Sequence, residues 1–586
     1  MGSVAIVVAI LAVWFGYRFY AGGIDRSVLR ADPAKATPAR LYNDGVDFMP
    51  ASSAVLFGYQ FKSIAALGPI VGPIVAVQWG WLPALLWLIL GVFFIGWVQD
   101  YTAAVMAMRN DGLTMGGLSY KLISPRARTI LLSFLYFYLL LIMGAFGAIC
   151  AALFANPKVA FGFIILTLAG VLSGQMTYKW RQDLVMTTVV TVLLAVVGIW
   201  LGTTGFFQSI VTAINGGKDS FVLFQTPYGP MKWSVFFWGI VVLFFCYLGA
   251  VLPIWRFAQP VNYVAFWLVL FGIVGSIIGI FFRMPSFGDF PAFTGFWAKG
   301  IIAPGIETPL WPILFVTIAC GAISGWHSLV STSGTARQLE KETDALPVGA
   351  GAMYTESVMA VLAVVFAVTA FGGFAGYLDA LKAGGPAGVF ARGMAEYLSV
   401  LGIAKDFGLA FGSAFLVIMA LTVMQLVLRF MRVASAELVG PIIPAFRNVH
   451  FGTLVGVLLT LALMWTGFWS RIWILFGGSN QLFASLALVL ITIWLVTTGR
   501  SYQWSLWPAV FMYISTVAAL LFTAYISFQA AFAPGKQIAF VVGDLASAAI
   551  GFALVILSVI LAYDALVAFG RARSSFRPAA APAGAD

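Results

Sequence analysis

Long apolar runs separated by short polar loops dominate this chain. Runs of about 17 to 28 residues predict fifteen membrane-spanning helices. The predicted spans begin near Ser3, Ala51, Trp81, Thr129, Val159, Leu184, Ser234, Val261, Pro309, Val348, Gly408, Phe451, Ile474, Ser505 and Ile538. With 62% hydrophobic and 9% charged residues, the composition agrees with a chain whose main solvent is lipid. We therefore expect an all-α polytopic membrane protein.

The basic residues alternate between the two sides of this map. Of the 32 lysines and arginines, 21 lie in loops that follow odd-numbered spans, 10 lie in the opposite loops, and Lys62 lies within span 2. Because cytoplasmic loops are enriched in Lys and Arg, the split predicts an external N-terminus and a cytoplasmic C-terminus. The net charge of +11 is thus a topology signal. No basic stripe indicates a nucleic-acid partner.

The order of the spans predicts four regions. Residues 1–50 are expected to form an N-terminal helix and a basic cytoplasmic loop, and residues 51–435 a transporter core of ten helices. Residues 436–570 provide four additional helices, and residues 571–586 a disordered tail rich in Pro and Ala. The sequence indicates no oligomeric state.

Span 2 carries a break signal at residues 68–73. Gly68, Pro69, Gly72 and Pro73 lower helix propensity and remove amide donors in a run that is otherwise apolar enough to cross a bilayer. Lipid cannot satisfy the backbone groups that such a break frees, so these groups must be buried in protein or line a cavity. Broken helices of this kind bind substrates and coupling ions in secondary transporters.

Span 9 places hydroxyl side chains on one helical face. Ser324, Ser328, Ser331 and Thr335 follow helical spacing. Their oxygens are suited to a hard cation or a polar substrate, whereas the structural alternative is helix packing through small residues. His327 lies in the same segment, where an imidazole either carries a proton or makes a structural hydrogen bond.

Three ionisable residues lie at membrane depth. Asp100 is near Arg109 and Lys121 in sequence, which favours a structural role close to the cytoplasmic end of span 3. Glu356 has no basic neighbour in sequence and either binds a proton or makes a long-range pair. Lys62 either attracts an anionic substrate or extends its ammonium to the cytoplasmic surface.

A second apolar run interrupted by Gly or Pro covers residues 249–255 in span 7. A third, residues 476–482, opens span 13. Spans 2 and 7 are five apart and enter from opposite sides, as an inverted repeat of five plus five helices requires. We therefore expect spans 2 to 11 to form a core of the leucine-transporter type. In that architecture a cation lies between the break in span 2 and the hydroxyls of span 9.

These segments also resemble the carbon starvation protein A (CstA) family of peptide and pyruvate transporters. The resemblance spans roughly residues 40–500 and rests on residues 44–50, 57–58, 68–73, 99–100, 252–255, 324–328 with 333–335, 349–356 and 476–482. It implies uptake of peptides or pyruvate-like carboxylates across a bacterial inner membrane, coupled to a cation. Where family members often carry a His pair, this chain has Tyr59 and Gln60. It also has Gln425, without a carboxylate, in the late-core run 422–429.

We therefore expect a cation-coupled secondary transporter and not an enzyme, with Na⁺ or H⁺ as the coupling ion and no cofactor, metal or catalytic residue. The alternative is a proton-translocating subunit of a membrane complex, which needs a relay of Lys, Glu and His across the membrane. Predicted substrate-binding residues are Gly68, Pro69, Gly72, Pro73, Lys62, Trp326, His327 and Ser328. Predicted coupling-ion residues are Gly68, Gly72, Ser331, Thr332, Thr335 and Glu356.

Overall fold

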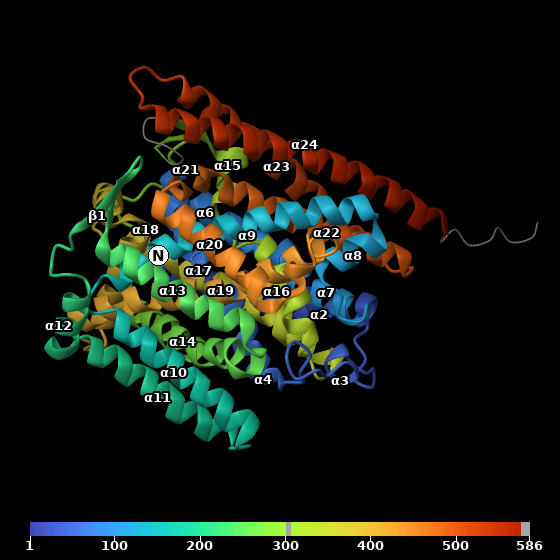
Figure 1. Cartoon of the computed structure of the whole chain (residues 1–586), viewed down its shortest axis with the longest axis horizontal. Helices are drawn as coiled ribbons and strands as arrows, with labels where there is room; N and C mark the ends of the chain where they lie inside the picture. Colours follow the sequence, from blue (N-terminus) through green and yellow to red (C-terminus); the bar gives the residue numbers. More distant parts are fainter. Residues whose placement is uncertain (301–305, 576–586) are drawn as a thin grey trace, which may run out of the picture.

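The structure is a computed structural model that describes residues 1–300 and 306–575. It is a bundle of helices with two small antiparallel hairpins (Figure 1). Within these described residues, thirteen helices are long and apolar enough to cross a membrane. The other two predicted spans, numbers 2 and 9, are each broken into two short helices. The prediction of an all-α polytopic membrane protein with broken helices is confirmed.

The thirteen spanning segments are Gly2–Leu29 with α1 (Gly2–Phe15), Trp81–Met108 with α6 (Trp81–Gly91) and α7 (Trp97–Met108), α9 (Pro125–Phe154), Ala160–Lys179 with α10 (Ala160–Gly174), α11 (Leu184–Gly202), α13 (Trp233–Val251), α14 (Ala258–Arg283), Glu342–Thr369 with α17 (Gly351–Thr369), α19 (Lys405–Leu438), α20 (Val449–Thr466), Trp469–Thr497 with α22 (Phe476–Thr497), α23 (Gln503–Ala531) and α24 (Ile538–Ser575). The short helices α2 (Gly22–Ile24) and α21 (Trp469–Ile472) lie inside the segments Gly2–Leu29 and Trp469–Thr497. The helices outside these segments and the broken spans are α3 (Pro38–Leu41), α8 (Met115–Leu122), α12 (Gly205–Ile214) and α18 (Phe374–Ser399). The hairpins pair β1 (Val222–Thr226) with β2 (Gly229–Lys232), and β3 (Trp297–Lys299) with β4 (Glu307–Pro309).

Span 2 consists of α4 (Ser53–Ile64) and α5 (Gly68–Ala76), which meet at an angle of 46°. The non-helical residues are 65–67, so the break lies just before the predicted segment 68–73. Pro69 falls in the first turn of α5, where backbone N–H groups have no acceptor within the helix. The N–H that proline lacks therefore costs no helical hydrogen bond there. Pro73 is accommodated inside α5 at the cost of one helical hydrogen bond.

Span 9 consists of α15 (Leu310–Thr317) and α16 (Gly325–Ser333), joined by the irregular residues 318–324. The run at 249–255 does not interrupt span 7, because α13 ends at Val251 and Pro253 lies in the turn before α14. Among the described residues, the second broken span is therefore span 9.

Two further features differ from the sequence-based picture. Residues 379–399, which lie between the predicted spans 10 and 11, belong to the helix α18, which is kinked at Gly385 and packs against α5, α14 and α19. In the predicted tail, α24 continues to Ser575, so residues 571–575 are helical, and residues 576–586 lie outside the described residues. The proposed division into a core and four additional helices remains a prediction.

The second half of span 9, α16, lies in the middle of the bundle (Figure 1). In Figure 1, α23 and α24 run along one edge, and α10 and α11 run along the opposite edge. Each of these pairs packs together, as the contacts of the helices also show. At least four-fifths of the residues are buried in α16 and in the most apolar stretches of the spans that contain α17 and α19. The polar residues of the broken spans are thus shielded from lipid.

Several loops that the charge map assigns to the same side of the membrane lie close together. Lys35, Arg109, Lys121 and Arg500, from the loops after spans 1, 3 and 13, line one cavity. On the other side, Asp544 forms ion pairs with Arg471 and Lys536 at the loops after spans 12 and 14. The helix connections are therefore consistent with the alternation of basic loops, whose sidedness remains a prediction.

We expect reporter fusions at Pro33 and at the C-terminal end of the chain to report a cytoplasmic location. The reason is the excess of Lys and Arg in the loops on that side. A fusion at Asp219, in the loop before β1, serves as the matched control and should report an external location. An external signal at Pro33 would contradict the orientation.

Candidate functional site

The two broken spans approach each other closely at glycines of α5. A Cβ added to Gly68 would lie 2.8 Å from the Cβ of Cys320 and would clash with its Sγ. A Cβ added to Gly72 would clash with the carbonyl oxygen of Thr317 and lie 3.2 Å from the Cα of Ile318. Only glycine permits this approach, so α5 is positioned directly against the irregular segment 318–324.

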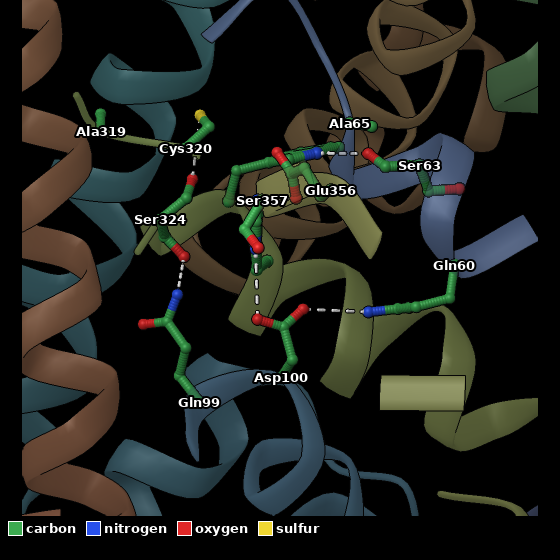
Figure 2. Close-up of polar contacts among 12 residues, drawn as sticks. Gln60, Ser63, Ala65, Gln99, Asp100, Ala319, Cys320, Ser324, Glu356 and Ser357 are labelled. Atoms are coloured by element: carbon green, nitrogen blue, oxygen red, sulfur yellow. Dashed lines mark hydrogen bonds and ion pairs between the residues drawn. The ribbon is translucent and has the colours of Figure 1, made fainter. Parts of the chain in front are cut away.

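Side chains from three other helices satisfy the carbonyls that the break in span 9 leaves free. The Trp87 indole donates to the Ile318 carbonyl at 3.3 Å, and Gln481 Nε2 donates to the Ala319 carbonyl at 3.3 Å. The Gln99 amide donates to the Ser324 carbonyl, as Figure 2 shows. These donors keep the irregular backbone stable at membrane depth, where an unpaired carbonyl is costly.

Asn480 caps the start of α16. Its Oδ1 accepts hydrogen bonds from the Tyr138 hydroxyl at 2.6 Å, from the Ser324 hydroxyl at 3.1 Å and from the backbone N–H of Trp326 at 3.3 Å. The indole of Trp326 donates to the carbonyl of Ser63 at 2.6 Å, near the end of α4. The motif at residues 476–482 thus fixes α16 relative to both broken spans.

A buried cluster of acidic and basic side chains lies between α4, α7, α16 and α17. His327 Nδ1 is 3.1 Å from Asp100 Oδ2, and His327 Nε2 is 3.3 Å from Glu356 Oε2. All three side chains have 0% exposure. Figure 2 shows Asp100 and Glu356 on opposite sides of the group. The imidazole therefore bridges two carboxylates in a water-poor environment.

The two contacts of His327 differ in geometry. The Asp100 contact is a hydrogen bond, whereas His327 Nε2 and both carboxylate oxygens of Glu356 have no hydrogen-bond partner among the described residues. A buried carboxylate whose oxygens accept no hydrogen bond is strongly disfavoured when charged. Glu356 is therefore the member of the cluster best placed to take up a proton.

Lys62 adds a second buried basic group. Its ammonium donates to the carbonyl of Ala65 at 3.0 Å, and the carbonyl of Met419 is 3.4 Å away. The side chain is fully buried, which excludes extension to the cytoplasmic surface. Lys62 is two residues from Gln60 on α4, and Gln60 donates to Asp100 of the cluster at 3.3 Å. Lys62 thus lies at the break of span 2, next to the cluster.

Gln60 links the hydroxyl face of α16 to the cluster. Its Nε2 donates to Asp100 Oδ1 at 3.3 Å and to the Ser331 hydroxyl at 3.1 Å, while its Oε1 accepts from the Thr335 hydroxyl. Ser328 donates to the Gly325 carbonyl and Thr332 to the Ser328 carbonyl, both at 2.8 Å. The described hydroxyls therefore bond to protein groups, and a coupling-ion role for Ser331, Thr332 and Thr335 remains a prediction.

The structure assigns Asp100 to a different environment from the one expected. Its neighbours are His327 and Gln60, whereas Arg109 forms an ion pair with Glu342 at 2.6 Å. Arg109 is close to Asp100 in sequence but not in space, because Asp100 is in the first turn of α7 and Arg109 lies beyond the end of that helix. Gln60, Gln99 and Asn480 were missed as site residues, although each is a polar residue in an apolar run.

The motif at residues 44–50 is anchored away from this cluster. Asp47 forms an ion pair with Arg429 near the end of α19. Arg429 also donates to the carbonyl of Gly249 at 3.2 Å, and the backbone N–H of Ile254 donates to the carbonyl of Val46 at 3.0 Å. This motif therefore ties the loop before α4 to α19 and to the turn between α13 and α14.

Two solved structures resemble the chain weakly. The manganese transporter of Eremococcus coleocola has a TM-score of 0.41 and 12% identity, covering 90% of this chain and 99% of that protein. MhsT in complex with L-phenylalanine has a TM-score of 0.40 and 14% identity, with coverages of 89% and 99%.

Curated relatives match most of the chain. The peptide transporter CstA of Campylobacter jejuni is 29% identical over 595 residues, covering 88% of this chain and 80% of the relative. The pyruvate/proton symporter BtsT of Escherichia coli is 29% identical over 609 residues, with coverages of 88% and 81%. The peptide transporter CstA of Escherichia coli is 29% identical over 613 residues, with coverages of 91% and 82%.

The family described as Carbon starvation protein CstA matches residues 1–380 and 374–519. These ranges include both broken spans, the cluster around His327 and the motif at 476–482. The resemblance inferred from the sequence motifs is confirmed. The chain belongs to the carbon starvation protein CstA family.

Proposed function

We propose that the chain is a proton-coupled secondary transporter that imports peptides or small carboxylates such as pyruvate across the bacterial inner membrane. The observation that carries this proposal is the buried cluster of Asp100, His327, Glu356 and Lys62 beside two broken helices. The names of the relatives, a peptide transporter and a pyruvate/proton symporter, agree with it.

The charges of the cluster suit the joint binding of a proton and an anion. Two carboxylates, one imidazolium and one ammonium sum to zero, which is the favoured state of a buried group of charges. Protonation of Glu356 leaves one positive charge in excess, and an anionic substrate restores neutrality. Each ligand therefore raises the affinity for the other, as thermodynamic linkage requires.

Lys62 and the start of α5 are the proposed contacts for the substrate carboxylate. Lys62 donates to Ala65 at the break, so its ammonium lies near the positive end of the α5 dipole. The carboxylate of pyruvate and the C-terminal carboxylate of a peptide share this chemistry. Trp326, which contacts Ser63, and His327 complete the proposed substrate site from α16.

Transport requires the broken spans to move. The cluster and Lys62 are fully buried, so neither a proton nor a substrate reaches them from water without a rearrangement of the surrounding helices. Segments 65–67 and 318–324 are the non-helical joints at which the two halves of each span change their relative orientation.

The test is uptake by the purified chain in liposomes with an imposed pH gradient. We expect accumulation of radiolabelled pyruvate or of a dipeptide, and competition between the two identifies the substrate class. A proton-translocating subunit is the alternative, because His327 Nε2 and Glu356 Oε2 are 3.3 Å apart and Lys62 is also buried. Proton movement without uptake of any of these substrates would favour that alternative.

A second experiment distinguishes H⁺ from Na⁺ as the coupling ion. We expect the Ser331→Ala/Thr332→Ala variant to keep most of its pH-driven uptake, because Thr332 bonds to its own helix and Ser331 only accepts from Gln60. Uptake is measured with a pH gradient alone and with a Na⁺ gradient alone. Na⁺-driven uptake that disappears in this variant would support the hydroxyl site for Na⁺ and contradict proton coupling.

A further inference from the structure

A cavity of about 500 Å³ lies where the ends of α7 and α22 meet α8 and the loop after span 1. It is separate from the cluster around His327. Its lining residues are Lys35, Arg109, Asn110, Lys121, Leu122, Trp494, Thr497, Thr498 and Arg500. Four of these nine residues are basic and none is acidic. The volume falls within the range of about 300 to 1,000 Å³ that is typical of small-molecule sites.

Arg109 gives the cavity a buried cationic group with an unused donor. Its Nε and Nη2 bind Glu342 at 2.6 and 3.0 Å, and Nη2 also donates to the carbonyl of Leu29 at 2.8 Å. The side chain is only 10% exposed, yet its Nη1 is buried without a hydrogen-bond partner in the described part of the chain. A buried guanidinium N–H without an acceptor is costly, so Nη1 is a donor that the pair with Glu342 leaves unused.

The remaining cations are not balanced by carboxylates. Lys35 and Lys121 are exposed and form no ion pair within residues 1–300 and 306–575. Arg500 donates to the carbonyls of Val28 and Leu29, which are neutral groups. Burial, and next the positive charge of Arg109, lower the pKa of Arg500, and Glu342 opposes this effect. The cavity therefore has a positive potential.

We propose that this cavity binds a phosphate-bearing anion. A phosphate monoester carries about −1.5 to −2 charges at neutral pH and three acceptor oxygens, which suits several converging cations better than a single carboxylate does. The nearly buried ring of Trp494 and the side chain of Leu122 provide an apolar wall for the rest of the ligand. This chemistry is shared by the headgroup of an anionic phospholipid and by a soluble phosphate compound.

The test uses the full chain purified in detergent and the variant Lys35→Gln/Lys121→Gln, whose side chains are exposed and make no ion pair in the described residues. Binding of inorganic phosphate is measured by calorimetry, and retained phosphatidylglycerol by native mass spectrometry. We expect one of the two to be reduced roughly tenfold or more, since charge-assisted hydrogen bonds are lost. Loss of phosphate binding indicates a soluble ligand, and loss of retained lipid indicates a headgroup.

The matched control is Lys341→Gln/Arg447→Gln, which removes two exposed cations outside the cavity lining. It should leave both measurements unchanged. Arg500→Gln is a second, independent variant within the cavity and should act like the lysine pair. If the lysine pair and Arg500→Gln bind phosphate and retain lipid as well as the control does, the proposal is overturned.

Discussion

Replacing His327 by glutamine is expected to reduce uptake driven by a proton gradient by about two orders of magnitude. His327 is the only group that contacts both Asp100 and Glu356 in the described cluster, at 3.1 and 3.3 Å. Removing one partner of a buried charge pair costs about 3 to 5 kcal/mol. A loss of about 3 kcal/mol corresponds to a fall of roughly 100-fold in an equilibrium constant. We expect pH-driven accumulation in liposomes to fall by about that factor.

The control for this variant is His450→Gln. His450 is the other histidine of the chain, is exposed and bonds to the Tyr247 hydroxyl at 2.6 Å. It is outside the cluster and should leave proton-driven uptake unchanged. Retention of full pH-driven accumulation by a folded His327→Gln protein would contradict the proposed role of the cluster.

Glu356→Gln separates proton coupling from substrate binding. Glutamine resembles the protonated acid in shape and charge, so substrate exchange between the two sides of a liposome should continue. Accumulation against a gradient should be lost, because the residue no longer releases a proton. Loss of exchange together with accumulation, in a protein of normal Tm, would instead indicate a structural role for Glu356.

Local patterns were sufficient to predict most of the membrane helices. Apolar runs identified all thirteen long spanning segments, because length and hydropathy are properties of contiguous residues. The run around Gly68 and Pro73 indicated a break in span 2 but misplaced it by a few residues. Proline is accommodated in a first helical turn, and a packed helix tolerates an internal proline when its neighbours support it.

The cluster itself was beyond the reach of local patterns. Asp100 and His327 are separated by 227 positions in sequence, and no periodicity connects them. Their sequence neighbours indicated a different pairing, with Arg109 close to Asp100. The helix α18 was missed for a related reason, because Gly384, Gly385 and Pro386 favour a loop locally whereas packing against α5 and α19 stabilises a kinked helix.

The glycines of α5 provide the second large expected effect. Gly72→Ala should reduce both stability and uptake, because the added Cβ clashes with the backbone carbonyl of Thr317 and forces the two broken spans apart. Overpacking typically costs about 1 to 3 kcal/mol, or roughly 5- to 150-fold in an equilibrium constant. The measurements are Tm in detergent and initial uptake rate in liposomes. Gly570→Ala, at a helix position with no neighbour within 4 Å, is the control and should preserve both.

Gly68 allows a sharper version of the same experiment, because its nearest neighbour is a side chain. Gly68→Ala should also reduce uptake, since the new Cβ meets the Sγ and the Cβ of Cys320. Adding Cys320→Gly removes both atoms and should restore part of the lost Tm and uptake. The same Cys320→Gly change should not rescue Gly72→Ala, whose clash involves backbone atoms of Thr317 and Ile318. Equal rescue of both glycine variants, or wild-type uptake by Gly72→Ala, would show that the close approach of α5 to residues 317–320 does not position the site.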